Sequence, residues 1–345
     1  MGRIYLIGLS VILGAILQKL HIPIPWTLGG ILGALILQFL PGSHPRWKSQ
    51  WRNYALVVIG YGTGRYVTVD VLRETLRQWP GIVGATVVAI LVAIVIAICM
   101  DKYEHLDFHS ALMGVMPGGF TQMTTMIDED KRVDANIVTV YQSLRLIAIV
   151  VSVPILVVQM LGAEMTGSTG TLAVHDGLSF WLLLPVVFLG GILFAKLKIA
   201  TPYLMGPIFV AALVALYFGK LNSPPSWLLA VAQLNVGMYV GTGLDTQKLK
   251  ELVKTLPGCF AGIALMLVVS IGFAHVLSDY YSFSLITAFL AMSPGGLGEM
   301  CLTGMALGEN VAIILTYQLF RFLFLSLVVP VAMKKYFGQP KLDNN

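Results

Sequence analysis

Charged residues are scarce in this sequence. Asp, Glu, Lys and Arg make up only 11% of its 345 residues, whereas they make up about 25% of an ordinary soluble domain. The charges stand in short stretches between apolar runs, and the run at 80–100 contains none. About 20 consecutive apolar residues are enough for a helix to cross the hydrocarbon core of a bilayer. The scarcity of charge therefore argues against a soluble domain, and the recurring apolar runs predict an integral membrane protein.

Cysteine and histidine are also few, at three and six residues. Cys99, Cys259 and Cys301 lie in or beside apolar runs, and their spacing matches neither a metal site nor a disulfide framework. Copper or iron chemistry needs clustered ligands, but the histidines are scattered. We therefore expect no cofactor, no metal site and no enzymatic activity, which argues against an oxygenase. Basic clusters interleaved with aromatic residues are also missing, so we do not expect nucleic acid as a partner.

What the sequence does contain is an internal repeat, which is the mark of a duplicated structural unit. The stretch GAILQKLHIPIPWTLGGI, from Gly14, returns as GILFAKLKIATPYLMGPI from Gly191, 177 positions later. The stretch MPGGFTQM at 116–123 returns as SPGGLGEM at 293–300 with the same offset. Because rare residues keep one spacing over a long distance, we predict two homologous halves.

Smaller motifs extend the repeat with slips of one or two positions. The motif Tyr-Gln-x-x-Arg ends at Arg145 in the first copy and at Arg321 in the second, a slip of one. The Gly-Thr-Gly motif occurs at 62–64 and 241–243, so we expect a slip of two there. We divide the chain into a first membrane repeat at 1–161, a linker outside the cytoplasm at 162–177, a second membrane repeat at 178–337 and a cytoplasmic tail at 338–345.

Each repeat contains six apolar segments, which in the first repeat are 3–20, 24–40, 54–66, 80–100, 108–127 and 134–161. If five of the six cross the bilayer, the second repeat is inverted, and most Lys and Arg residues then face the cytoplasm, as the positive-inside rule requires. The non-crossing segment is either the broken fifth, as a re-entrant hairpin, or the short third. We predict an all-α integral membrane protein with about ten transmembrane helices in two inverted repeats, located in the bacterial cytoplasmic membrane with both termini cytoplasmic.

A Pro-Gly-Gly triplet interrupts one apolar segment in each repeat, at 117–119 and 294–296. Proline lacks an N–H and glycine adds backbone freedom, so the triplet breaks a helix. Broken backbone at membrane depth must be buried in protein or line a polar cavity, and matching breaks in inverted repeats indicate the site of a secondary transporter. The predicted substrate and ion site consists of Pro117, Gly118, Gly119, Thr121, Gln122, Gln142, Arg145, Pro294, Gly295, Gly296, Glu299, Thr303, Gln318 and Arg321.

Glu299 is the residue that we single out, because it is the one charge in the stretch 282–307. A carboxylate inside a membrane is costly unless it is paired, hydrated or neutralised by a proton. It is therefore either a proton or cation site or a structural ion pair, for instance with Arg321. Arg145 and Arg321 each follow a tyrosine by four residues, on the same helix face. They are either counter-ions for an anionic substrate or supports that hold the broken segments in place.

These motifs resemble the AbrB family of bacterial inner-membrane proteins, which is defined by the same duplicated unit. The resemblance covers essentially the whole chain, although Met116 stands where serine is expected before the first triplet. Some members of that family are described as regulators of gene expression and others as oxygenases. The stretch from 293 to 313 is also similar to the Pro-Gly-Gly crossing region of bile-acid-type sodium symporters, in which broken helices cross at the ion and substrate sites.

Two functions follow from these observations. The first is a secondary transporter of a small organic solute, coupled to H⁺ or Na⁺, with its site at the two broken helices. The alternative is a membrane-embedded regulator of gene expression that acts through a cytoplasmic partner. The expected partners are the lipid bilayer, a small-molecule solute and the coupling ion, and a homo-oligomer is left open.

Overall fold

The computed structural model describes residues 2–40, 45–117, 133–159, 179–199, 201–244, 249 and 252–337, without the side chains of 254 and 329–337. The linker at 162–177 and the tail at 338–345 lie outside the described residues, and so do Gly118, Gly119, Thr121 and Gln122.

Helices make up the described elements, which confirms the all-α prediction for this part of the chain. Their bounds are α1 Gly2–Lys19, α2 Pro25–Phe39, α3 Ser49–Gly64, α4 Val69–Arg77, α5 Trp79–Glu104, α6 Phe108–Val115, α8 Ala135–Gln159, α9 Phe180–Lys196, α10 Pro202–Phe218, α11 Ser226–Gly243, η1 Val253–Thr255, α13 Leu256–Tyr281, α14 Leu285–Met292, α15 Leu297–Ala306 and α16 Val311–Phe337.

Matching sequence signals begin the matching helices of the two halves. Proline is the first residue of α2 and of α10, where its missing N–H is no loss because the first turn of a helix leaves N–H groups unpaired. The short helices α6 and α14 each begin with a side-chain cap. Asp107 accepts a hydrogen bond from the N–H of Ser110, and Ser284 accepts one from the N–H of Thr287, both at 3.0 Å. The same local chemistry therefore builds the same element twice.

Five of the described helices are long and apolar enough to cross a membrane: α1, α5, α8, α13 and α16 as far as Val328. A sixth span results if α3 and α4, which are bent by 81° relative to each other, count as one broken span. Helices α2, α9 and α10 are apolar but have only 15 to 17 residues. By length and composition, the described helices therefore give the chain the character of a membrane protein with five or six spans.

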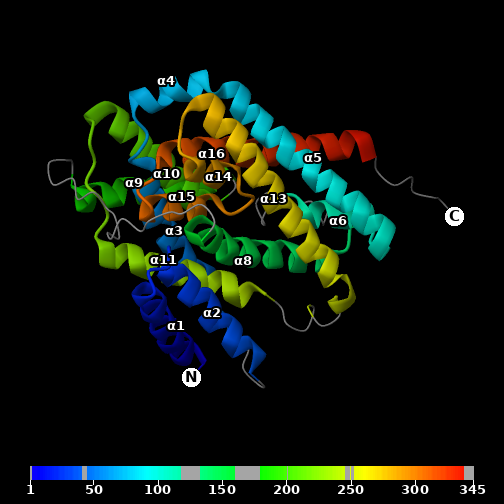
Figure 1. Ribbon diagram of the computed structural model, residues 1–345. Helices are drawn as coiled ribbons and strands as arrows, with labels where there is room; N and C mark the ends of the chain where they lie inside the picture. The colour runs from blue at the N-terminus through cyan, green and yellow to red at the C-terminus, as the bar shows by residue number, and fades with distance from the viewer. Residues whose placement is uncertain are drawn as a thin grey trace.

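The helices form two bundles, and each bundle takes equivalent helices from both halves of the chain (Figure 1). We call the first the glycine bundle; it contains α1, α2, α3, α9, α10 and α11. We call the second the break bundle; it contains α5, α6, α8, α13, α14, α15 and α16. Within the glycine bundle, two small apolar cores lie at α1–α2–α11 and at α3–α9–α10. The halves of the sequence are thus interleaved in space.

Glycines bring the helices of the glycine bundle into backbone contact. A Cβ atom on Gly60 of α3 would lie 2.7 Å from the carbonyl oxygen of Leu204 in α10. A Cβ atom on Gly237 of α11 would lie 2.1 Å from the carbonyl oxygen of Thr27 in α2. Small residues four positions apart let membrane helices approach this closely. The two contacts correspond to each other at the 177-residue offset, so α3 packs on α10 as α11 packs on α2.

The next glycine along each helix corrects one expectation from the sequence. A Cβ on Gly64 would lie 2.4 Å from the oxygen of Ile208, and a Cβ on Gly241 would lie 2.8 Å from that of Ile31. Gly64 therefore corresponds to Gly241, again at an offset of 177. The expected pairing of 62–64 with 241–243 by a slip of two is wrong, because helix packing and not the Gly-Thr-Gly string fixes the register.

Helices α5 and α13 run antiparallel, and each begins beside the end of the other (Figure 1). Near the start of α13, a Cβ on Gly258 would lie 1.9 Å from the Glu104 carboxylate at the end of α5. Near the start of α5, the N–H of Gly81 donates to the Tyr281 hydroxyl at the end of α13, at 3.0 Å. The equivalent helices α5 and α13 thus point in opposite directions.

Candidate functional site

The end of α6, just before the first break, is held by a glutamine and an arginine from α8. The Gln142 side-chain N–H donates to the carbonyl oxygens of Met113 at 2.6 Å and Met116 at 3.1 Å. The Arg145 Nη1 donates to Val115 at 2.9 Å and also to Met116, while its Nη2 donates to the Gln142 Oε1 at 2.7 Å. Two side chains one helical turn apart therefore bind three carbonyls at the C-terminal end of α6.

The second half repeats this clamp at the end of α14. The Gln318 side-chain N–H donates to the carbonyls of Leu290 at 2.7 Å and Ser293 at 3.0 Å. The Arg321 Nη1 donates to Met292 at 2.8 Å, and its Nη2 donates to Ser293 at 2.7 Å and to Gln318 Oε1. We call these two arrangements the Gln–Arg clamps.

The clamps satisfy groups that a break would otherwise leave unpaired. The last carbonyls of a helix have no partner within the helix and carry about half a negative charge together. Arg145 and Arg321 are 7% and 4% exposed, so their charges are buried against these carbonyls. The sequence left two roles open for these arginines, and their hydrogen bonds show that they support the broken segments. The ion pair between Glu299 and Arg321, which was one of the two alternatives for Glu299, is not among the ion pairs of the described residues.

A cavity of about 240 Å³ lies where the two bundles meet. Helices α3, α10 and α11 of the glycine bundle form one wall, and α8, α15 and α16 of the break bundle form the other. Eight predicted site residues line it: Pro117, Gln142, Arg145, Gly295, Gly296, Glu299, Gln318 and Arg321. Thr303 is buried behind them and donates its hydroxyl to the Glu299 carbonyl at 2.9 Å. The structure thus brings residues from both breaks to one cavity.

Glu299 stands in the first turn of α15, three residues after the N-cap Gly296. Its carboxylate lies against the α-carbon of that glycine, because a Cβ there would be 1.9 Å from Glu299 Oε2. Negative charge at a helix N-terminus is favourable, since the unpaired N–H groups carry partial positive charge. Within the described chain, no basic side chain lies within ion-pair distance of this carboxylate. The side chain is half-buried and faces the cavity.

Arg52 is a cavity residue that the sequence did not single out. It lies in the first turn of α3 and lines the cavity. Its guanidinium stands over the ring of Tyr239 from α11, 4.4 Å from the centroid. Its Nη2 donates to the Asn53 side chain at 3.0 Å, and its Nε has no hydrogen-bond partner among the described residues. Nothing in the local sequence separates it from its basic neighbours.

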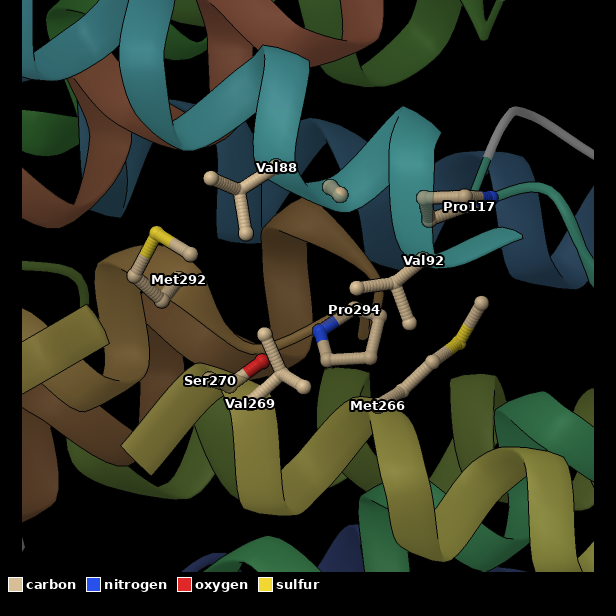
Figure 2. Close-up of a pocket in the computed structure, with 9 residues that line it drawn as sticks. Val88, Val92, Pro117, Met266, Val269, Ser270, Met292 and Pro294 are labelled. Carbon is tan, nitrogen blue, oxygen red and sulfur yellow. The ribbon is translucent and has the colours of Figure 1, made fainter. Parts of the chain in front are cut away.

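The prolines of the two breaks meet at a second, much smaller cavity of about 10 Å³ (Figure 2). Pro117 and Pro294 face it, with Val88 and Val92 from α5 above and Met266 from α13 below. This volume scarcely holds one water molecule, and its walls are almost wholly apolar. The small cavity therefore marks where the breaks pack together, and the larger cavity is the candidate binding site.

Comparison with known proteins agrees with the motifs. The family model described as transition state regulatory protein AbrB matches residues 26–336. The chain belongs to the AbrB family. One relative is a protein of Escherichia coli (strain K12) that is named as a candidate regulator, AbrB. It is 24% identical to this chain over 326 residues, and the alignment covers 93% of this chain and 92% of that protein. The uncharacterised protein YhjN of Bacillus subtilis (strain 168) is 23% identical over 362 aligned residues, 95% of this chain and 91% of YhjN. No solved structure matches the chain significantly.

AbrB-family membership confirms the resemblance that the repeated motifs indicate, but it assigns no role to the residues that line the cavity. The cavity itself combines apolar walls with a few polar groups, which is the usual composition of a site for a small molecule. In the part of the chain that the structure describes, no group of three or more His, Cys, Asp or Glu side chains is placed to hold a metal ion.

Proposed function

We propose that this AbrB-family chain is a secondary transporter of a small organic solute, coupled to H⁺ or Na⁺, in the bacterial cytoplasmic membrane. The cavity between the two bundles is its substrate site. The single observation that carries the proposal is that this cavity is walled on one side by the glycine bundle and on the other by residues of both breaks. A site between two rigid bodies is what alternating access requires, because rocking one body against the other opens the site to each side in turn.

Two features support the ten-span inverted topology that belongs to this proposal. Helices α5 and α13 are equivalent in the repeat and antiparallel in space. The α3–α10 and α11–α2 contacts are equivalent as well, so the same packing occurs twice with the halves exchanged. Inverted repeats with discontinuous helices in matching positions characterise secondary transporters. On this topology the linker lies outside the cytoplasm, and the termini lie in the cytoplasm.

Glu299 is the coupling residue in this mechanism. Its carboxylate lies at the cavity, at the start of a half-helix, and lacks an ion-pair partner among the described side chains. A carboxylate in such a place can take up and release H⁺ or hold Na⁺ as the cavity changes its exposure to the two sides of the membrane. The Gln–Arg clamps keep the half-helices in position while this happens, because they satisfy the carbonyls that the breaks expose.

Flux measurements in proteoliposomes test the proposal. The purified chain is reconstituted, a pH or Na⁺ gradient is imposed, and uptake of a panel of radiolabelled carboxylates, amines, amides and sugars is followed. We expect gradient-driven accumulation of at least one solute, and loss of gradient dependence in Glu299→Gln. The matched control is Asp101→Asn, which changes an exposed acid at the end of α5. Absence of gradient-driven flux for every member of the panel would refute transport.

A regulatory role is the second candidate, because the Escherichia coli relative is named for one. A membrane-embedded regulator of gene expression needs a cytoplasmic partner, since the chain has no long soluble stretch. Arg46 and Lys48 are exposed just before α3 and are the residues to change. Arg52 is unsuitable for this test because it faces the cavity. Co-purification of a cytoplasmic protein that is lost in the double variant Arg46→Ala, Lys48→Ala would favour regulation.

A further inference from the structure

We infer that the transported solute is a small organic anion whose acidic group binds Arg52. This inference rests on the proposed transport function and names the substrate class of the same cavity.

The cavity carries an excess of positive charge. Among the described residues that line it, three are arginines and one is a glutamate: Arg52, Arg145, Arg321 and Glu299. The ends of α6 and α14 each offset about half a charge at the two clamp arginines, and the start of α15 adds about half a positive charge next to Glu299. A net positive potential remains. Unpaired charge is costly in a site of low dielectric constant, so an anionic solute stabilises this arrangement and a cationic solute is disfavoured.

Arg52 is the guanidinium best placed to take that anion. The Nη atoms of Arg145 and Arg321 are directed at backbone carbonyls in the clamps. Among the described residues, the guanidinium of Arg52 donates one hydrogen bond, to the Asn53 side chain, and its buried Nε has no hydrogen-bond partner. The ring of Tyr239 covers one face of it at 4.4 Å, which fixes its plane. A fixed guanidinium with open N–H groups binds a carboxylate through paired hydrogen bonds.

The rest of the cavity limits the body of the solute. Leu56 and Ile59 from α3, Leu204 and Met205 from α10, and Phe322 from α16 supply an apolar surface. The volume of about 240 Å³ falls below the roughly 300–1,000 Å³ of sites for drug-sized ligands. A short aliphatic or aromatic monocarboxylate fits both requirements, since its acid group meets Arg52 and its hydrocarbon body meets the apolar wall.

The test uses three probes of one size and different charge: benzoate, benzamide and benzylamine. Binding to the purified full-length chain is measured by thermal shift in detergent, with hexanoate as a second anion. We expect saturable stabilisation by benzoate and hexanoate, and none by benzamide or benzylamine. Arg52→Gln should weaken benzoate binding by about 10- to 100-fold, as expected for lost hydrogen bonds to a charged group. Arg46→Gln, an exposed arginine just before α3, is the matched control and should bind as the unaltered chain does.

Stabilisation by benzylamine or benzamide but not by the anions would overturn the anion inference and leave transport intact. Saturable benzoate binding without flux in any imposed gradient would support the anion site and refute transport. Failure of all four probes to bind would overturn the inference. If Arg52→Gln does not fold, Arg52→Lys and Glu299→Gln replace it. We expect Arg52→Lys to bind benzoate more weakly than the unaltered chain and Glu299→Gln to bind it more tightly. Equal affinity in all three proteins would overturn the assignment.

Discussion

Replacing Gly237 with alanine should force α2 and α11 apart. The new Cβ would lie 2.1 Å from the carbonyl oxygen of Thr27, 2.9 Å from its carbonyl carbon and 3.1 Å from the α-carbon of Gly30. All three atoms belong to the backbone of α2, so no side chain can swing away. Carbon atoms pack at about 3.5–4.0 Å. The two helices must therefore separate by roughly 1 Å, which weakens every contact along their shared face.

The free energy of this change has two opposing parts. Overpacking in a well-packed core costs about 1–3 kcal/mol, and a contact with backbone belongs at the upper end of that range. Alanine regains about 1 kcal/mol over glycine in a helix interior. We expect a net loss of about 2 kcal/mol for Gly237→Ala. Gly272 in α13 has nothing within 4 Å of its Cβ position, so Gly272→Ala should gain up to about 1 kcal/mol and serves as the control.

The assay is thermal unfolding of the purified variants in detergent, followed by the fraction that stays monodisperse. A difference of about 3 kcal/mol between the two variants corresponds to a gap of at least about 5 °C in Tm, with Gly237→Ala the lower. Gly60→Ala should fall between them, because its clash with the oxygen of Leu204 is milder, at 2.7 Å. A Gly237→Ala protein that melts at or above Gly272→Ala would refute the close approach of α2 and α11.

Three further outcomes are expected from changes at the site. Gln142→Leu and Gln318→Leu should each lower stability in a melting assay by about 1–3 kcal/mol, because each leaves one carbonyl without its side-chain donor and removes the amide oxygen that accepts from the clamp arginine; very unequal losses would contradict the equivalence of the clamps. Gly296→Ala should change stability by less than about 1 kcal/mol but alter the gradient dependence of flux, because its backbone is extended and only the Glu299 carboxylate must move; unaltered coupling would count against Glu299. Glu299→Gln should tighten benzoate binding about tenfold in the thermal-shift titration, since a repulsion of about 1–2 kcal/mol across a partly hydrated cavity is removed; weaker binding would contradict the charge argument.

Local patterns in the sequence predicted the two breaks and identified the glutamines and arginines that bind beside them. The spacing of Gln142 and Arg145 puts both on one helix face, and the repeated motif marks Gln318 and Arg321 as their equivalents. The choice between substrate counter-ion and structural support could not be made from the sequence, because it depends on carbonyls that another helix presents. Backbone atoms of that kind have no sequence signature.

The partners of helices were also beyond the reach of local patterns. The four-residue spacing of Gly237 and Gly241 indicates a close contact, but not that α2 is the neighbour. For the same reason, nothing in the sequence distinguishes Arg52 from its basic neighbours Arg46 and Lys48. Its place in the cavity depends on Tyr239, far along the chain, and on the packing of α3 between α10 and α11.

The exchange of equivalent helices between the bundles bears on how the chain assembles and on its ancestry. Helix α2 can pack on α11 only after α11 has been synthesised, about 200 residues later. At 5–20 residues per second this is a delay of roughly 10–40 s. Neither half contains the partners of its own glycine contacts, because α3 packs on α10 and α11 packs on α2. The repeated contacts are the ones that an ancestral pair of identical halves would make, and residues 1–161 and 178–337 made as separate polypeptides should reassemble only when both are present.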